Sequence, residues 1–137
     1  MRKEIIEKII EILRNDAELP VKYFYFGRPI TPIDYPFCVV EPAPSGSRNI
    51  SDRTHDKRKH VFLINILIFT RSVKPDEAEK TALEYIERVY IDIVNNNTLD
   101  GLTADMLPIL ITPEAPLYEG EHAISVQRLS VEAWWLE

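Results

Sequence analysis

The stretch His60-Val-Phe-Leu-Ile-Asn-Ile-Leu-Ile-Phe-Thr70 constrains the fold more than any other part of the sequence. Its aliphatic and aromatic residues favour a strand, and the run is far too short to cross a bilayer as a helix. Successive side chains of a strand point to opposite faces, and here both alternating sets, from residues 61 to 69, are mainly apolar. The strand is therefore expected to be buried on both sides. Two helices cover one face of a sheet easily, so the second face is expected to meet another sheet or another subunit.

Two other segments have the periodicity of amphipathic helices. Within residues 2–15, isoleucine and leucine recur at helical spacing among charged residues, and the pattern ends before Pro20. Residues 75–95 begin with Pro75, which suits a first helical turn, and with acidic residues that suit the positive end of the helix dipole. Their apolar stripe, predicted to be buried, contains Ala78, Ala82, Ile86, Val89 and Ile93, together with Leu83, Tyr90 and Val94. Each helix is expected to pack with this stripe on a sheet.

Four further strands are predicted, at residues 21–26, 37–41, 106–112 and 122–136. The polar stretch from residue 42 to residue 59 is predicted to be a long loop. In the last strand the apolar residues change parity, which predicts a bulge near Gln127-Arg128. The expected fold is one α+β domain over residues 1–137. Its sheet is mainly antiparallel because short links join the strands, and its order is helix, strand, strand, long loop, strand, helix, strand, strand.

The chain lacks the motifs on which common enzyme classes depend. Its four glycines are isolated, so no phosphate-binding loop is present, and no nucleophile elbow occurs. The single cysteine, Cys38, lies in an apolar run and is interpreted as a core residue. The spacing of His55 and His60 with Asp52 and Asp56 matches no metal site. We therefore predict no catalytic residues, no cofactor and no metal, and hence not an enzyme.

Charge is distributed unevenly along the chain. The formal net charge is −6, which argues against a surface that grips nucleic acid or an anionic membrane, and the amino terminus lacks the apolar core of a signal peptide. A soluble protein of a reducing cytoplasm is expected. Five basic residues lie between positions 48 and 59 against two acidic ones, so this segment carries +3 and the remainder −9. These candidate contact residues are Arg48, Arg53, Lys57, Arg58 and Lys59.

We interpret residues 43–59 as a flexible basic loop on an acidic body. Such a loop is either simply solvated or functional, because loops this long are uncommon in compact domains without a role. In the functional case it docks on an acidic neighbour or meets phosphates. An acidic body with a basic arm also suits head-to-tail self-association, in which one copy's arm meets the next copy's body.

The layout resembles that of the tail terminator (tail completion) proteins of long-tailed bacteriophages and related proviruses. The segment Tyr35-Pro-Phe-Cys-Val-Val40 is similar to a strand that precedes a long hairpin loop in that family, and residues 60–70 look like the return strand. A short turn, the helix at 75–95 and a last strand at 125–136 follow in the family's order. The resemblance covers nearly the whole chain and rests on layout and hydrophobic pattern. Lys74-Pro75 stands where the family often has a glycine.

This resemblance implies a non-enzymatic ring, usually a hexamer, that ends the tail tube and joins tail to head. It implies copies of the chain, the tail tube protein and a head–tail connector protein as partners, transient contact with passing DNA, and no membrane. The place would be the tail or neck of a virion, with the host cytoplasm during assembly. Two alternatives stay open: another head–tail connector or neck subunit, and a small nucleic-acid-binding α+β module that uses the basic loop.

Overall fold

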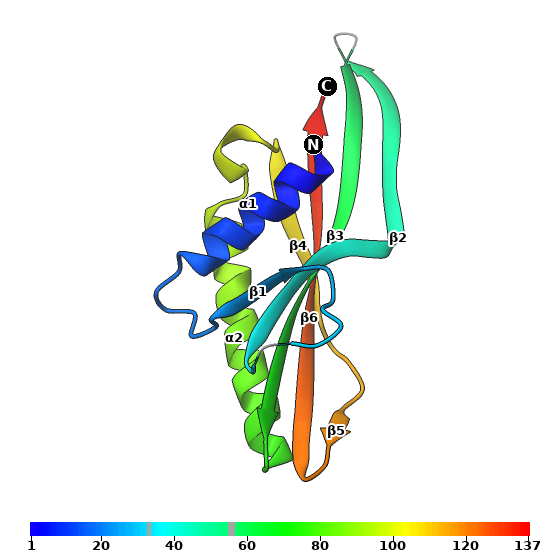
Figure 1. Cartoon of the computed structure of the whole chain (residues 1–137). Helices are drawn as coiled ribbons and strands as arrows, with labels where there is room; N and C mark the ends of the chain where they lie inside the picture. The colour runs from blue at the N-terminus through cyan, green and yellow to red at the C-terminus, as the bar shows by residue number, and fades with distance from the viewer. Residues whose placement is uncertain (33, 55–56) are drawn as a thin grey trace.

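A computed structural model describes residues 1–32, 34–54 and 57–137, and for residues 45–54 and 57 it describes the backbone only. The described strands form one six-stranded sheet in the order β1-β2-β3-β6-β4, with β5 paired to β6. Both helices lie on one face of this sheet (Figure 1). This is the α+β fold that the sequence predicts. The elements in chain order are α1 (Arg2–Arg14), β1 (Tyr23–Phe26), β2 (Phe37–Thr54), β3 (Lys57–Ser72), α2 (Pro75–Asn95), the 3₁₀ turn η1 (Leu99–Gly101), β4 (Asp105–Pro113), β5 (Leu117–Glu119) and β6 (His122–Leu136).

Both helices lie where the periodicity of the sequence predicts them. Pro75 occupies the first turn of α2, and five residues of the predicted stripe are buried: Ala78, Ala82, Ile86, Val89 and Ile93. The prediction was wrong for Leu83, Tyr90 and Val94, which are 41–46% exposed because they lie on a neighbouring side of the helix that does not face the core. The hydroxyl of Thr70 donates a hydrogen bond of 2.6 Å to the carbonyl oxygen of Ala78, which fixes the start of α2 to the end of β3. The buried residues of α1, from Ile5 to Leu13, join the same core. The two helices therefore share one apolar layer above the sheet.

The first strand pairing differs from the prediction. β1 runs parallel to β2, with Tyr23 opposite Phe37 and Phe26 opposite Val40, whereas the other pairings between the described strands are antiparallel. A parallel pair requires the chain to return to the end from which the first strand started. The ten residues 27–36 between the two strands make this return. The expectation of antiparallel pairing from short links was wrong at this position because that link is not short.

The predicted loop of residues 42–59 is largely strand. β2 continues to Thr54 and β3 already begins at Lys57, and the two strands pair as a hairpin that extends beyond the rest of the sheet (Figure 1). The register shifts between Pro42 and Ser47 and again between Ile50 and Thr54. A polar hairpin arm buries no apolar face, so it leaves no hydrophobic alternation in the sequence. Its backbone hydrogen bonds to the partner strand hold it instead.

Apolar residues fill both faces of the central strands. On the helix face, Ile64, Ile66 and Ile68 of β3 pack with α1 and α2 in the main core. On the opposite face, Leu67 and Phe69 belong to a second cluster, which residues of β1, β2, β6 and the β1–β2 connection complete. The double burial predicted for residues 61–69 is thus present, and aromatic side chains of the same chain cover part of the second face. Those partly buried covering residues are Tyr23, Tyr25 and Tyr35.

The predicted bulge in the last strand is absent. β6 pairs with β3 in one continuous register from Ala123 to Leu136. Its apolar residues change parity because Ile124 and Val126 face the second cluster, whereas Leu129 and the odd-numbered residues after it face the main core. The irregularity lies instead in β4, between Pro108 and Leu110.

Candidate functional site

The five basic residues predicted as contacts all lie in the hairpin of β2 and β3. Arg48 pairs with Val61, Lys57 with Thr54, and Lys59 with Ile50. Arg53 lies in β2 and Arg58 in β3. The hairpin thus gathers all five onto two adjacent strands. His55 and Asp56, two of the residues considered as metal ligands, lie outside the described residues.

The start of β3, near the tip of the hairpin, is hydrogen-bonded to the end of the chain. The amide of Arg58 donates to the carbonyl oxygen of Glu137 at 2.8 Å, and the amide of Glu137 donates back to Arg58 at 3.0 Å. The ammonium of Lys59 lies 4.7 Å from the centroid of the Trp134 ring, a distance at which a cation is attracted to the aromatic face. β6 therefore positions the last two basic residues of the segment on a fixed support.

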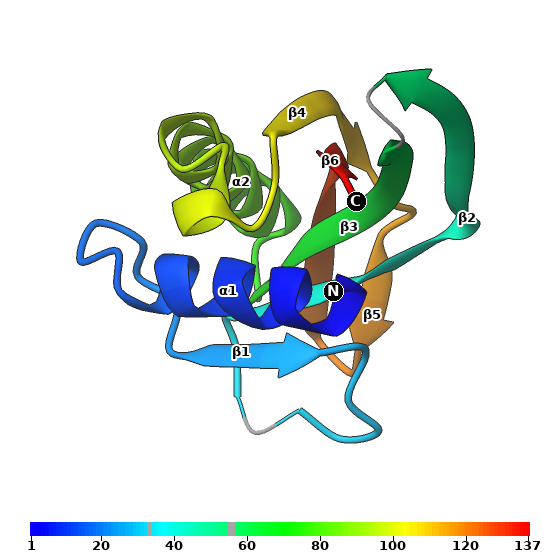
Figure 2. The same cartoon turned by 90° about the horizontal axis from the view of Figure 1, so that it is seen from above.

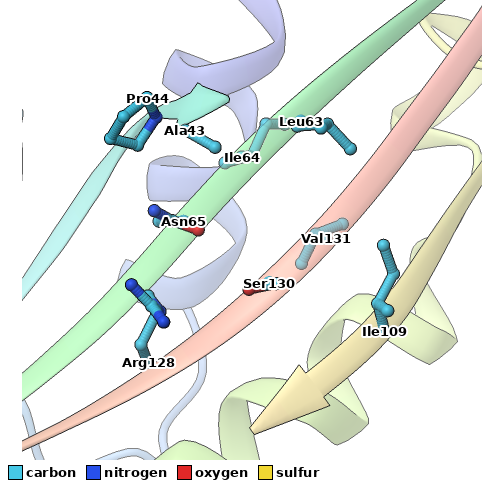
Figure 3. Close-up of a pocket in the computed structure, with 9 residues that line it drawn as sticks. All are labelled: Ala43, Pro44, Leu63, Ile64, Asn65, Ile109, Arg128, Ser130 and Val131. Atoms are coloured by element: carbon cyan, nitrogen blue, oxygen red, sulfur yellow. The ribbon is translucent and has the colours of Figure 1, made fainter. Parts of the chain in front are cut away.

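A groove opens on the sheet face opposite the helices, where β2 bends away from β3. It has a volume of about 370 Å³. Ala43 and Pro44 of β2 line one side and Ile109 of β4 lines the other, as Figure 3 shows. Beyond Ile109, which is 53% exposed, Leu110 continues the apolar edge at 58% exposure. Sequence reasoning missed this groove because it depends on the bend of β2, for which the only signal was the pair of prolines 42 and 44 in a strand.

Polar side chains line the floor of the groove. Asn65, Ser130 and Arg128 all line it and lie on neighbouring strands β3 and β6 (Figure 3). Asn65 is only 6% exposed and is paired in register with Ser130. Among the described residues, the Nε of Arg128 is buried without a hydrogen-bond partner. A guanidinium in this setting can bind a carboxylate or phosphate presented by another molecule.

The exposed side of α2 carries a second apolar stripe. Leu83, Tyr90, Ile91 and Val94 are each more than 40% exposed, at spacings that place them along one side of the helix. Glu87 lies within this stripe. A helix that packs only on its own core normally has a polar outer face. This stripe is therefore a candidate contact surface, and it lies on the opposite side of the sheet from the groove.

A titratable cluster connects α2 to the turn after α1. Arg88 of α2 donates to both carboxylate oxygens of Asp16, at 2.7 and 3.3 Å, and hydrogen bonds from Arg88 lower the pKa of Asp16 to about 2. Burial, together with the neighbouring Asp16, raises the pKa of Asp92 to about 7. Glu18 completes the cluster with an ion pair of 2.9 Å to Arg88. The cluster joins α2 to the turn after α1, and none of its residues lines the groove on the opposite face of the sheet.

Three observations concern chemistry and membranes. Among the described residues, no three His, Cys, Asp or Glu side chains are grouped so that they could hold a metal ion. Burial raises the pKa of the Cys38 thiol, so the thiol stays protonated in the core. No helix in the described part of the chain combines the length and hydrophobicity needed to cross a membrane.

Comparison with protein-family models gives no match, and comparison with curated proteins gives none either. A solved structure, described as the virion of the native gene transfer agent (GTA) particle, contains a chain with a similar fold. The two chains superpose with a TM-score of 0.67 at 16% sequence identity, over 94% of this chain and 92% of that chain. At this level of identity the similarity establishes a shared fold.

Proposed function

We propose that this chain is a structural subunit of a phage-like virion and not an enzyme. One observation carries the proposal: the fold matches a chain of a gene transfer agent virion over nearly the full length of both chains. The layout of the sequence, which resembles tail terminator proteins, supports the same class independently of the structure. Such a subunit acts with copies of itself and with other virion proteins.

The proposed role within that class is a ring, hexameric in this proposal, that ends the tail tube and joins tail to head. Its partners are then the tail tube protein and a head–tail connector protein, and its place is the tail or neck, with assembly in the host cytoplasm. The hairpin of β2 and β3 supports this role because it extends beyond the body of the sheet (Figure 1). Arg58 and Lys59 lie near its tip, where Glu137 and Trp134 of the chain's end contact them. We assign the hairpin to contact with the tube or the lumen of the ring.

Another connector or neck subunit would use the same fold and the same surfaces. A nucleic-acid-binding module is the second candidate function, and the clustering of five basic residues on one hairpin favours it. The rest of the chain carries a formal net charge of −9, which weakens that alternative. Acidic groups within a Debye length of a nucleic acid repel its phosphates.

Sedimentation velocity and electron microscopy of the purified chain test the ring. The expected result is a closed ring, either alone or on addition of purified tail tubes. A chain that stays monomeric with and without tubes would contradict the proposal.

Deletion of residues 46–58 is expected to leave the fold intact by circular dichroism and to abolish joining of tails to heads. A deletion variant that still joins tails to heads would show that the hairpin is not needed for joining. A variant that lacks residues 114–116 serves as the control for shortening a loop elsewhere.

A further inference from the structure

The outer stripe of α2 needs a partner outside its own chain. Three of its residues, Leu83, Tyr90 and Val94, repeat at helical spacing and are 41, 43 and 46% exposed. The neighbouring side of the same helix is occupied by the core, where Ile86 and Val89 are buried. The apolar surface of α2 therefore extends beyond the side that its own core covers, and an exposed apolar surface of this kind marks a contact site.

The groove on the other side of the sheet has matching chemistry. Its rim is apolar and exposed at Ile109 and Leu110, and its floor carries the guanidinium of Arg128, whose Nε has no hydrogen-bond partner among the described residues. A surface that fits it presents apolar side chains around one acidic group. The stripe of α2 has this composition, because Glu87 lies between Leu83 and Tyr90 along the helix.

Charge favours the same pairing. α2 contains six acidic and two basic residues, a formal charge of −4, whereas the sequence from residue 48 to residue 59 carries a formal charge of +3. Complementary charge of this size speeds association and disfavours the pairing of identical surfaces. The groove lies on the face of the sheet away from the helices. Figure 2 shows α2 on the other side of the sheet, the side that also carries α1. Two different surfaces that pair in this way form a head-to-tail contact, which generates rings when the rotation closes.

We propose that α2 of one copy lies against the groove of the next copy, with Leu83, Tyr90 and Val94 on the rim and Glu87 facing Arg128. This inference rests on the proposed function, since it names the surfaces that build the ring. The occupant of the groove is a second copy of this chain.

Surface variants of α2 test the contact with little risk to folding. Leu83→Lys and Glu87→Arg are expected to weaken self-association at least about tenfold, because they place charge on the apolar rim or against Arg128. Glu121→Arg is the matched control, since Glu121 is exposed on the turn between β5 and β6 and lies outside both surfaces. Sedimentation velocity over micromolar to millimolar concentrations gives the dissociation constants.

A charge exchange tests the specific pair. Arg128→Glu alone is expected to weaken assembly like Glu87→Arg, and the double variant is expected to recover most of the lost affinity. If Arg128→Glu misfolds, as judged by its melting curve, the two α2 variants, Leu83→Lys and Glu87→Arg, still test the proposed contact. Unchanged assembly in both α2 variants contradicts this interface while leaving the ring in place. A wild-type chain that never assembles contradicts the ring itself, so the two failures are distinguishable.

Mixed cysteine variants test the head-to-tail geometry. Cys38 is fully buried and can be left in place. Tyr90→Cys and Leu110→Cys, mixed and treated with a short bismaleimide, are expected to form dimers that contain one chain of each kind. Either variant alone is expected to give few cross-links. Efficient cross-linking of one variant to itself, or of Glu121→Cys to either, would overturn the proposed contact.

Discussion

Asp92 illustrates how a single buried carboxyl group connects pH to folding. Its side chain is almost removed from solvent, and its Oδ2 has no hydrogen-bond partner among the described residues. Burial first, and then the neighbouring carboxylate of Asp16, raise its pKa from 3.8 to about 7. The folded chain therefore holds a proton here that the unfolded chain releases above about pH 4.

The sign of the pH dependence follows from that proton. As pH rises from about 4 to about 7, the free energy of unfolding falls. Over this range the native state binds a proton at Asp92 that the unfolded state has already released, so a rise in pH favours the unfolded state. Asp16 acts in the opposite sense at lower pH, since Arg88 holds its pKa at about 2 and the stability it contributes is lost below about pH 4. The cluster alone therefore favours mildly acidic conditions.

Asp92→Asn is expected to remove this loss of stability. The amide of the variant can donate a hydrogen bond to Asp16 but does not ionise. The difference in free energy of unfolding between the variant and wild type should therefore be about 1–3 kcal/mol more favourable to the variant at pH 8 than at pH 5, allowing for partial solvent screening. Urea unfolding at both pH values measures the difference. Glu84→Gln, on the exposed side of α2, is the control. Identical pH profiles for wild type and Asp92→Asn would contradict the raised pKa.

At the scale of elements, β6 shows how one strand serves two faces. Trp135 is 4% exposed, belongs to the main core and stacks on His60 at 5.3 Å between ring centroids. Its neighbour Trp134 lies on the opposite face, beneath the ammonium of Lys59. The alternation of strand side chains thus assigns one tryptophan to the core and the other to the surface that supports the hairpin.

The two tryptophans are expected to differ sharply on truncation. Trp135→Ala should lower the free energy of unfolding by about 3–5 kcal/mol, because it leaves a cavity in the main core. Trp134→Ala removes a partly exposed ring and should cost less than about 1.5 kcal/mol. Urea unfolding with a shared m-value gives both changes in the free energy of unfolding. Equal changes for the two variants would contradict the assignment of Trp135 to the core and Trp134 to the surface.

At the scale of the whole molecule, charge separation decides how the chain meets nucleic acid. The hairpin segment carries +3 and the remainder −9, so long-range repulsion opposes the local attraction. A ring through which DNA passes should not hold DNA tightly. The proposed function therefore predicts weak retention that depends on salt.

Retention of a labelled oligonucleotide measures this property. At low salt, weak binding is expected, with most of it lost by about 0.2 M salt as counterion release becomes less favourable. Arg58→Gln with Lys59→Gln should reduce the salt slope by about 1.8, whereas Lys22→Gln with Lys80→Gln, at exposed sites elsewhere, should leave it nearly unchanged. Tight binding that persists at high salt would favour the nucleic-acid-binding alternative over the tail ring.

The sequence by itself determined the elements that bury an apolar face. Residues 75–95 and 60–70 carry one or two such faces, so periodicity located α2 and the core of β3, and both faces of β3 proved to be buried. The α+β class follows from these elements. Burial leaves a pattern in the order of residues, which is why it can be read without coordinates.

Only the tertiary structure decided the features that leave no such pattern. The polar arms of the hairpin are held by backbone pairing, and the parallel pairing of β1 depends on where residues 27–36 return the chain. The parity change of β6 was visible, yet only the two-sided packing of the sheet explained it without a bulge. The groove joins Asn65, Arg128 and Ile109 from three strands, and a bend in β2 opens it. Contacts between residues distant in sequence are set by register and curvature, and neither is encoded in the local alternation of apolar and polar residues.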